Sequence, residues 1–248
     1  MPFLTRWDDD HSRPKFTSAL RDVFVRAVLP AVALFGVVVG FGFLLKGPLD
    51  TYAEWEKGIN RWYQDGRTAT GEAITNYMSM IGNTEYVIGV GVIVCAIVWW
   101  RTKEWWFAVV PMIAISLQAT VFVLAAAVVG RARPPVERLD PTPPTSSFPS
   151  GHVGASTALY LSFALMATRI SNVVVRRVVI VLCILAPLLV SYARLYRGAH
   201  HVSDIVWGII NGVVCALLAW NYLRREPAPD TVTEARGEAT GETAQTRA

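Results

Sequence analysis

Charged residues are scarce in this sequence. Only 17% of its 248 residues are Asp, Glu, Lys or Arg, against roughly 25% in soluble domains, while 53% are hydrophobic. So small a charged fraction excludes an ordinary soluble domain. The net charge of +4 does not indicate a nucleic-acid binder, because the charges lie in short islands between long apolar runs and form no basic patch.

Cysteines and acidic residues are also few. Cys95, Cys183 and Cys215 each lie inside an apolar run, so they form neither a disulfide framework nor a metal-ligand spacing, and we interpret them as small buried hydrophobic residues. Between Asp140 and Glu226 the only acidic residue is Asp204. A single acidic residue among apolar segments that hold no other acid is a candidate functional residue.

Long apolar runs fill most of the chain. A transmembrane helix needs about 20 mainly apolar residues, because it rises about 1.5 Å per residue across a hydrocarbon core of about 30 Å. Six runs without a charged residue meet or approach that length: 27–45, 86–100, 105–130, 153–168, 178–193 and 205–223. The sequence therefore predicts an all-α, polytopic membrane protein whose residues 23–225 form a six-helix bundle.

The segments outside these runs differ in character. Residues 1–22 read as a cytoplasmic arm, and residues 226–248 carry five acids, two arginines and no aromatic residue, which is typical of a disordered acidic tail. Residues 51–77 mix tryptophan and tyrosine with charges, which predicts amphipathic helices on the outer surface between helices one and two. Gly208 and Gly212 have the GxxxG spacing of close helix packing, which we assign to the bundle itself.

The distribution of Lys and Arg in the loops predicts the orientation. The loops on the side of the two termini hold more Lys and Arg than the loops on the other side, so both termini are expected in the cytoplasm. We expect the membrane to be that of a bacterial cell, with the site on its outer face. The N-terminus is too acidic to be a cleaved signal.

Three polar clusters fall on the outer side in this topology. GRARPP contains Arg131 and Arg133, FPSGH contains Ser150, Gly151 and His152, and ARLYRGAHHVSD contains Arg194, His200 and Asp204. Together they supply fixed positive charge, a helix N-terminus, imidazoles and one carboxylate. Arginine forks match tetrahedral oxyanions, and backbone N–H groups at a helix start bind anions, so the set suits a phosphate ester.

The histidines divide into two predicted roles. His200 and Asp204 are four residues apart, which on a helix places both on one face, so that Asp204 can hold one ring nitrogen as N–H and leave the other with its lone pair. His152, from another helix, is free to protonate a leaving group. Taken singly, these residues have simpler interpretations, as snorkelling arginines or helix caps, but their joint occurrence at one face favours the phosphate site.

These residues resemble the signature of the type 2 phosphatidic acid phosphatases, K-x6-R-P, P-S-G-H and S-R-x5-H-x3-D. Arg133-Pro134 matches the first part, Pro149-Ser150-Gly151-His152 the second, and Arg194, His200 and Asp204 the third. Two positions depart from it: the lysine is Ala126, and the serine before Arg194 is Ala193. The signature region is 126–204.

The resemblance implies a role for each residue. His200 would be the nucleophile that forms a phosphohistidine, Asp204 its orienting partner and His152 the general acid. Arg133, Ser150, Gly151 and Arg194 would bind the phosphate. Because the signature lysine is missing, we add the hypothesis that Arg131 replaces it. No metal and no other cofactor is implied.

The sequence thus predicts a metal-independent phosphatase embedded in the lipid bilayer and acting on a membrane lipid. The candidate substrates are a polyprenyl diphosphate such as undecaprenyl diphosphate, phosphatidic acid and phosphatidylglycerol phosphate. Two alternatives remain: an oxidase like the vanadium haloperoxidases, which share the signature but are soluble, and a non-catalytic lipid-binding or transport protein. The oligomeric state is left open.

Overall fold

The protein is described here by a computed structural model that covers residues 12–51, 54–141 and 146–224. Within these ranges the regular structure is entirely helical, with no β-strand, which confirms the predicted all-α class. The predicted tail, 226–248, and the first half of the predicted arm, 1–11, lie outside the described residues.

Five helices are long and apolar enough to cross a membrane, so the chain is a multi-pass integral membrane protein. The first, Phe16–Lys46, consists of α1 (Phe16–Val23), a π-helical turn (Phe24–Val28) and α2 (Leu29–Lys46). It begins inside the segment that we predicted as the arm. The others are α5 (Thr84–Thr102), α6 and α7 together (Trp105–Ala108 and Val110–Val129), α9 (Val173–Tyr196) and α10 (Val202–Asn221).

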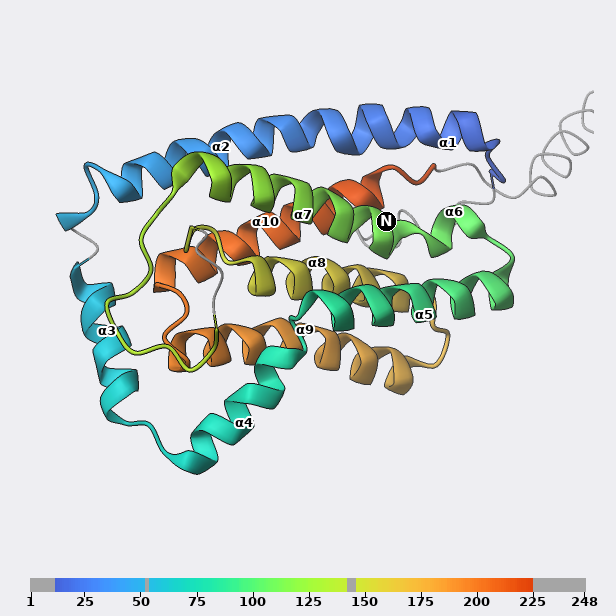
Figure 1. The fold of residues 1–248 in the computed structure, drawn as a ribbon. Helices are drawn as coiled ribbons and strands as arrows, with labels where there is room; N and C mark the ends of the chain where they lie inside the picture. The colour runs from blue at the N-terminus through green and yellow to red at the C-terminus, as the bar shows by residue number, and fades with distance from the viewer. Residues whose placement is uncertain (1–11, 52–53, 142–145, 225–248) are drawn as a thin grey trace, which may run out of the picture.

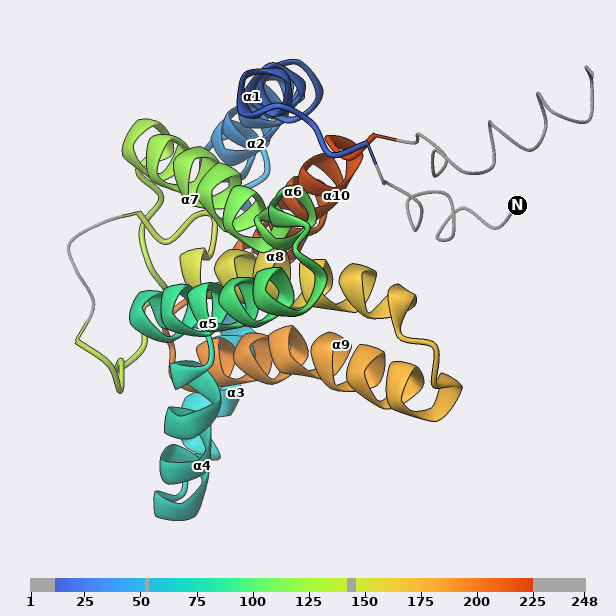
Figure 2. The same cartoon turned by 90° about the vertical axis from the view of Figure 1, so that its right-hand side faces the viewer.

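The sixth predicted span is a shorter helix at the centre of the bundle. Helix α8 (Gly151–Met166) has 16 residues, about 24 Å at 1.5 Å per residue, and a 3-10 turn (Ala167–Arg169) follows it. It packs against α5, α7, α9 and α10, which surround it in both views (Figures 1 and 2). Neighbouring helices therefore bury most of α8, and it falls short of the length that the other five reach.

Small residues let α8 and α10 approach closely. A Cβ at Gly212 would lie 2.5 Å from Cβ of Thr157, and one at Gly208 would lie 2.8 Å from the Ser150 carbonyl oxygen. The GxxxG spacing of α10 thus serves packing inside the bundle, as predicted. This packing fixes the start of α8 beside the start of α10.

Two short helices connect the first and second long helices. Helices α3 (Glu54–Asp65) and α4 (Ala69–Met80) lie at one end of the bundle and both pack against α9 (Figure 1). The loops that join α7 to α8 and α9 to α10 lie at the same end. Trp62 and Tyr77 are largely exposed there. Two helices therefore stand where we predicted them, and their contact with the membrane surface stays a prediction.

Candidate active site

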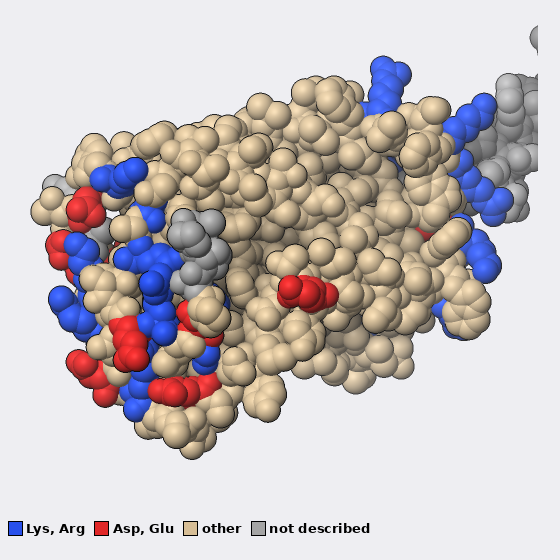
Figure 3. All heavy atoms as spheres, viewed as in Figure 1, with Lys and Arg blue, Asp and Glu red and all other residues tan. Residues whose placement is uncertain are grey.

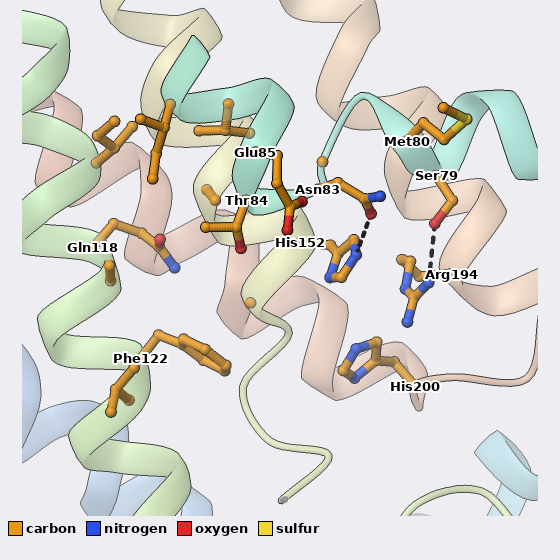
Figure 4. A pocket seen from close by; sticks show the side chains of 18 of the residues that line it. Ser79, Met80, Asn83, Thr84, Glu85, Gln118, Phe122, His152, Arg194 and His200 are labelled. Atoms are coloured by element: carbon orange, nitrogen blue, oxygen red, sulfur yellow. Dashed lines mark hydrogen bonds between the residues drawn. The ribbon is translucent and has the colours of Figure 1, made fainter. Parts of the chain in front are cut away.

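The three predicted clusters meet at this end of the bundle, around one cavity. The cavity has a volume of about 750 Å³, and five predicted site residues line it: Arg133, Gly151, His152, Arg194 and His200 (Figure 4). We call the part formed by these five residues the phosphate end. Arg131, Ser150 and Asp204 are not among the lining residues.

His200 lies in the turn between α9 and α10 and is almost completely buried. Its Nδ1–H donates to the Ser147 carbonyl oxygen at 2.8 Å, because a carbonyl oxygen can only accept. The amide of Asn60, on α3, donates to the His200 carbonyl oxygen at 3.0 Å. Burial lowers the pKa of His200 and outweighs the opposing effect of Asp204. The ring is therefore neutral at neutral pH, with the lone pair on Nε2.

Asp204 supports His200 less directly than we predicted. Helix α10 begins at Val202, so His200 precedes the helix, and its Nδ1 lies 3.8 Å from Oδ2 of Asp204, beyond a direct hydrogen bond. The carboxylate of Asp204 instead accepts hydrogen bonds from Ser147 Oγ at 2.7 Å and from the His201 backbone N–H at 2.8 Å. Ser147 thus contacts both residues, through its carbonyl oxygen and its hydroxyl.

Arg131 occupies a different place from the one predicted. Its guanidinium is buried behind the cavity, where Nη1 lies 2.6 Å from Asp204 and Nη2 lies 3.0 Å from Glu56. Glu56, which is 1% exposed on α3, also accepts the Ser203 backbone N–H at 2.6 Å. Arg131 therefore neutralises two buried carboxylates and cannot supply the charge of the missing lysine to the cavity.

The start of α8 contributes backbone donors to the phosphate end. Helix α8 begins at Gly151 with Ser150 as its N-cap, as predicted, and the first intrahelical bond runs from Gly154 N–H to the Ser150 carbonyl oxygen. The Ser150 N–H donates to the Asp204 carbonyl oxygen at 2.9 Å, so it is not available to a ligand. Ser150 Oγ is buried and has no partner within the described ranges. The positive end of α8 thus faces the cavity through Gly151 and His152.

Arg133 and Arg194 supply the fixed positive charge. Arg194, in the last turn of α9, donates from Nη1 to Asp140 at 2.6 Å and to Ser79 at 2.9 Å. Its buried Nε–H has no partner among the residues that the structure describes. Arg133 donates from Nη1 to the Ala199 carbonyl oxygen at 2.9 Å, in the loop that carries His200. Both guanidinium groups are therefore held in place at the cavity.

Asp140 is a site residue that the sequence pattern did not indicate. It receives hydrogen bonds from Arg194 and Arg197. Partial burial would raise the pKa of Asp140, but the hydrogen bond from Arg197 and the charges of both arginines outweigh it and lower that pKa. Asp140 is thus ionised and orients Arg194.

His152 has its own partner. Its Nε2 lies 2.8 Å from Oδ1 of Asn83, in the turn that precedes α5 (Figure 4). An amide oxygen only accepts, so the contact places a proton on Nε2. Asn83 therefore fixes the orientation of the second imidazole, and the two histidines are held by separate elements.

The cavity continues from the phosphate end into an apolar part between α5 and α7. We call this part the inner arm. It is lined by Val87, Ile88, Met112, Ile115 and Phe122, and its walls also include the amide of Gln118. One cavity thus combines a cationic end with a hydrocarbon-like arm. In the described part of the chain, no group of three or more His, Cys, Asp or Glu side chains is arranged to hold a metal ion.

The comparisons with known proteins agree with this arrangement. The sequence model of the PAP2 superfamily matches residues 105–228, half of the chain. No curated protein matches the sequence. The fold is similar to the crystal structure of the first transmembrane PAP2 type phosphatidylglycerolphosphate phosphatase from Bacillus subtilis, with a TM-score of 0.66 and 17% identity, over 77% of this chain and 92% of that one. It is also similar to Aquifex aeolicus LpxE, with a TM-score of 0.52 and 18% identity, over 65% of this chain and 92% of that one.

Proposed function

The chain belongs to the PAP2 superfamily, and from this premise we propose that it is an integral-membrane lipid phosphatase working through a phosphohistidine intermediate. One observation carries the proposal: His200 and His152 face the same cavity as Arg133 and Arg194, and that cavity continues into an apolar arm. A phosphate bound at the cationic end would leave the lipid chain in the inner arm.

His200 is the nucleophile in this proposal. Its Nδ1–H is committed to the Ser147 carbonyl oxygen, so the Nε2 lone pair is free to attack phosphorus. A bond forms between Nε2 and phosphorus while the bond from phosphorus to the lipid oxygen breaks. Arg133, Arg194 and the start of α8 stabilise the negative charge that develops on the non-bridging oxygens.

His152 is the general acid. Because the Nε2 proton is donated to Asn83, the proton that passes to the departing lipid oxygen is the one that Nδ1 carries when the ring is protonated beside the bound phosphate. The lipid oxygen leaves as an alcohol or, from a diphosphate, as a lipid monophosphate. In the second half-reaction the neutral His152 takes a proton from water, and the water oxygen attacks phosphorus. The bond to His200 Nε2 breaks, inorganic phosphate is released and both histidines return to their starting state.

Asp204 acts on His200 by its charge, and Arg131 acts on His200 through Asp204. The Asp204 carboxylate lies 3.8 Å from Nδ1, so it stabilises the positive charge that the ring acquires when Nε2 bonds to phosphorus. Arg131 holds this carboxylate in place. Ser150 does not line the cavity and is fully buried, so its predicted role as a phosphate ligand stays a prediction.

The charge distribution supports an outward-facing site. Most charged side chains gather at the two ends of the molecule, and the belt between them is mainly apolar on the face shown, apart from acidic atoms near its middle (Figure 3). Both signs mix at the end with α3 and α4, and Lys and Arg dominate at the other end. The start of α1 and the end of α10 lie at the Lys- and Arg-dominated end. By the positive-inside rule this asymmetry favours a cytoplasmic location for that end, which supports our proposal that the cavity opens on the outer face of a bacterial membrane.

Phosphate release from purified protein tests the proposal. We would assay the full chain in detergent with EDTA present against polyprenyl diphosphate, phosphatidic acid and phosphatidylglycerol phosphate, and compare it with His200→Ala. Release without added metal, blocked by vanadate and lost in the variant, is the expected result. No release from any of the lipids, or equal release by the variant, would contradict the proposal.

A further inference from the structure

Helix α4 projects sideways from the end of the bundle that holds the cavity, which we call the cavity end. It extends beyond α9, its main packing partner (Figures 1 and 2). A short turn, 81–83, joins it to α5, which is long and apolar enough to span the membrane. A helix that leaves the bundle sideways at this level lies over the lipid around the spans, because no other long helix continues beneath it.

The side of α4 that faces away from α9 carries no charge. Ile74 is 49% exposed and Tyr77 is 71% exposed, and Thr70 and Ala73 complete this surface, which we call the α4 face. The one charged residue of α4, Glu72, is partly buried, whereas α3 has five charged residues in the same length of 12 residues. Tyrosine and aliphatic side chains without charges suit the interfacial layer of a bilayer. The α4 face therefore continues the apolar belt of the spans.

The end of α4 holds two residues of the phosphate end. Ser79 accepts a hydrogen bond from Nη1 of Arg194 at 2.9 Å, and Oδ1 of Asn83 lies 2.8 Å from Nε2 of His152 (Figure 4). A Cβ at Gly82 would lie 2.9 Å from the His152 carbonyl oxygen and 2.9 Å from a valine side chain of α9. The turn after α4 is thus wedged between α8 and α9. A shift of α4 would move both hydrogen-bond partners together.

We propose that bilayer lipid at the cavity end binds the α4 face and thereby holds Ser79 and Asn83 in the positions that the site requires. This inference rests on the proposed phosphatase function and concerns its regulation. Lipid contact favours the packed position of α4, and without it α4 also populates positions in which Arg194 and His152 lose these partners. Activity therefore depends on the bilayer around the protein as well as on the substrate.

A comparison of bilayer and detergent tests this coupling. We would measure kcat and KM for phosphate release from a short-chain phosphatidic acid that dissolves as monomers, with the full chain in phosphatidylcholine nanodiscs and in detergent micelles, which offer the α4 face no extended lipid surface. Tyr77→Ser removes the aromatic ring from the α4 face, and Tyr77→Trp keeps one. Trp100→Ser, 68% exposed near the opposite end of α5, is the matched control.

Nanodiscs should raise kcat/KM of the wild type, Tyr77→Trp and Trp100→Ser by about tenfold over detergent, whereas Tyr77→Ser should lose most of this gain. In nanodiscs its KM should rise through Arg194 and its kcat should fall through His152. In detergent its activity and its thermal unfolding should match the wild type, which excludes a general folding defect. All the proteins receive substrate in the same way, so delivery cannot cause the difference.

Three results would overturn the coupling: equal wild-type activity in both media, a gain that Tyr77→Ser keeps, or a gain that Trp100→Ser also loses. A Tyr77→Ser protein that is unstable in detergent would contradict the exposed role of this side chain. No phosphate release by the wild type in either medium would instead contradict the phosphatase function itself.

Discussion

At the scale of residues, the two imidazoles of the site have different hydrogen-bond partners. The Ser147 carbonyl oxygen holds Nδ1 of His200, and Asn83 holds Nε2 of His152. The first contact leaves the lone pair of His200 on Nε2, and the second fixes the orientation of the His152 ring at the cavity, with its Nε2 proton directed to Asn83. Two histidines of the same intrinsic chemistry thus take different roles through their partners.

Asn83→Leu should impair His152 alone. Without the amide oxygen the ring loses its fixed orientation, and proton transfer matters most when the leaving group is poor. We expect kcat/KM for a lipid phosphate to fall by on the order of tenfold to a hundredfold, with a much smaller loss for an aryl phosphate, whose leaving group needs little protonation.

A double-mutant cycle is the control for this prediction. In a His152→Ala background, Asn83→Leu should have little further effect, because the group that it positions is gone. Full additivity of the two substitutions, or equal losses on the lipid and the aryl phosphate, would show that Asn83 does not act through His152.

The lowered pKa of His200 predicts a pH dependence of both activity and stability. Its folded-state pKa lies below the ordinary value of 6.5, so the acid limb of kcat/KM that reports this nucleophile should lie below pH 6.5. Below pH 6.5 the unfolded chain binds a proton at His200 that the folded protein does not bind. The free energy of unfolding should therefore fall as the pH drops through 6.5.

Thermal unfolding in detergent measures the stability effect. The wild type should lose stability as the pH falls below 6.5, and His200→Gln, which cannot titrate, should lose less over the same range. Identical pH profiles for the two proteins would contradict the assignment.

At the scale of elements, helix α3 supports the loop that carries His200 from outside the bundle. Glu56 accepts Ser203 N–H and pairs with Arg131, and Asn60 donates to the carbonyl oxygen of His200. A segment between the first two long helices therefore positions residues at the start of α10.

Arg131→Ala should mainly destabilise the fold, whereas Arg133→Ala should mainly reduce activity. Removing Arg131 leaves Glu56 and Asp204 buried without their cation, and breaking a buried ion pair costs about 3–5 kcal/mol. Arg133 faces the cavity, so its loss removes a phosphate contact. Chemical unfolding and kcat/KM measured on both variants check this, and an unchanged stability of Arg131→Ala would contradict the buried role.

Sequence patterns predicted residues that line the cavity better than the residues that hold them in place. Arg133, His152, Arg194 and His200 were predicted because they fall at the ends of apolar runs, where polar side chains stand out. Asn83 and Glu56 were not predicted, because their partners lie 69 and 75 positions away and nothing local marks them. Arg131 was misplaced for the same reason: its partner Glu56 comes from a surface helix.

The helices show the same limit of local patterns. Hydropathy predicted all the long helices, because a continuous apolar run is sufficient for a membrane span. It also predicted a membrane span at α8, which is shorter than the other five because its apolar residues face protein on all sides. The bilayer sets no minimum length for a helix that is buried in this way. Small residues such as Gly154 and Gly208 are the signal of that central position.

At the scale of the whole molecule, the few charges have two separate uses. Some lie at the two ends and orient the protein in the membrane, and others are gathered around one cavity. The apolar belt between the ends explains the low charged fraction. A lipid phosphatase must be embedded in this way because its substrate stays in the bilayer.

Labelling of single cysteines tests the predicted orientation. In a cysteine-free background, Trp62→Cys, on exposed α3, should react with a membrane-impermeant maleimide in intact cells. Arg101→Cys, exposed at the opposite end of α5, should react only after the cells are permeabilised. The reverse pattern would place the cavity in the cytoplasm.

Trapping the covalent intermediate tests the central claim most directly. The purified chain would be mixed with a lipid carrying radioactive phosphate, denatured within the first turnover at alkaline pH, where a phosphorus–nitrogen bond survives, and digested for peptide mapping. We predict label on the peptide that contains His200, lost in His200→Asn and accumulating more readily in His152→Ala when the leaving group is good. Rapid phosphate release with no label on that peptide, or label that persists in His200→Asn, would contradict the account.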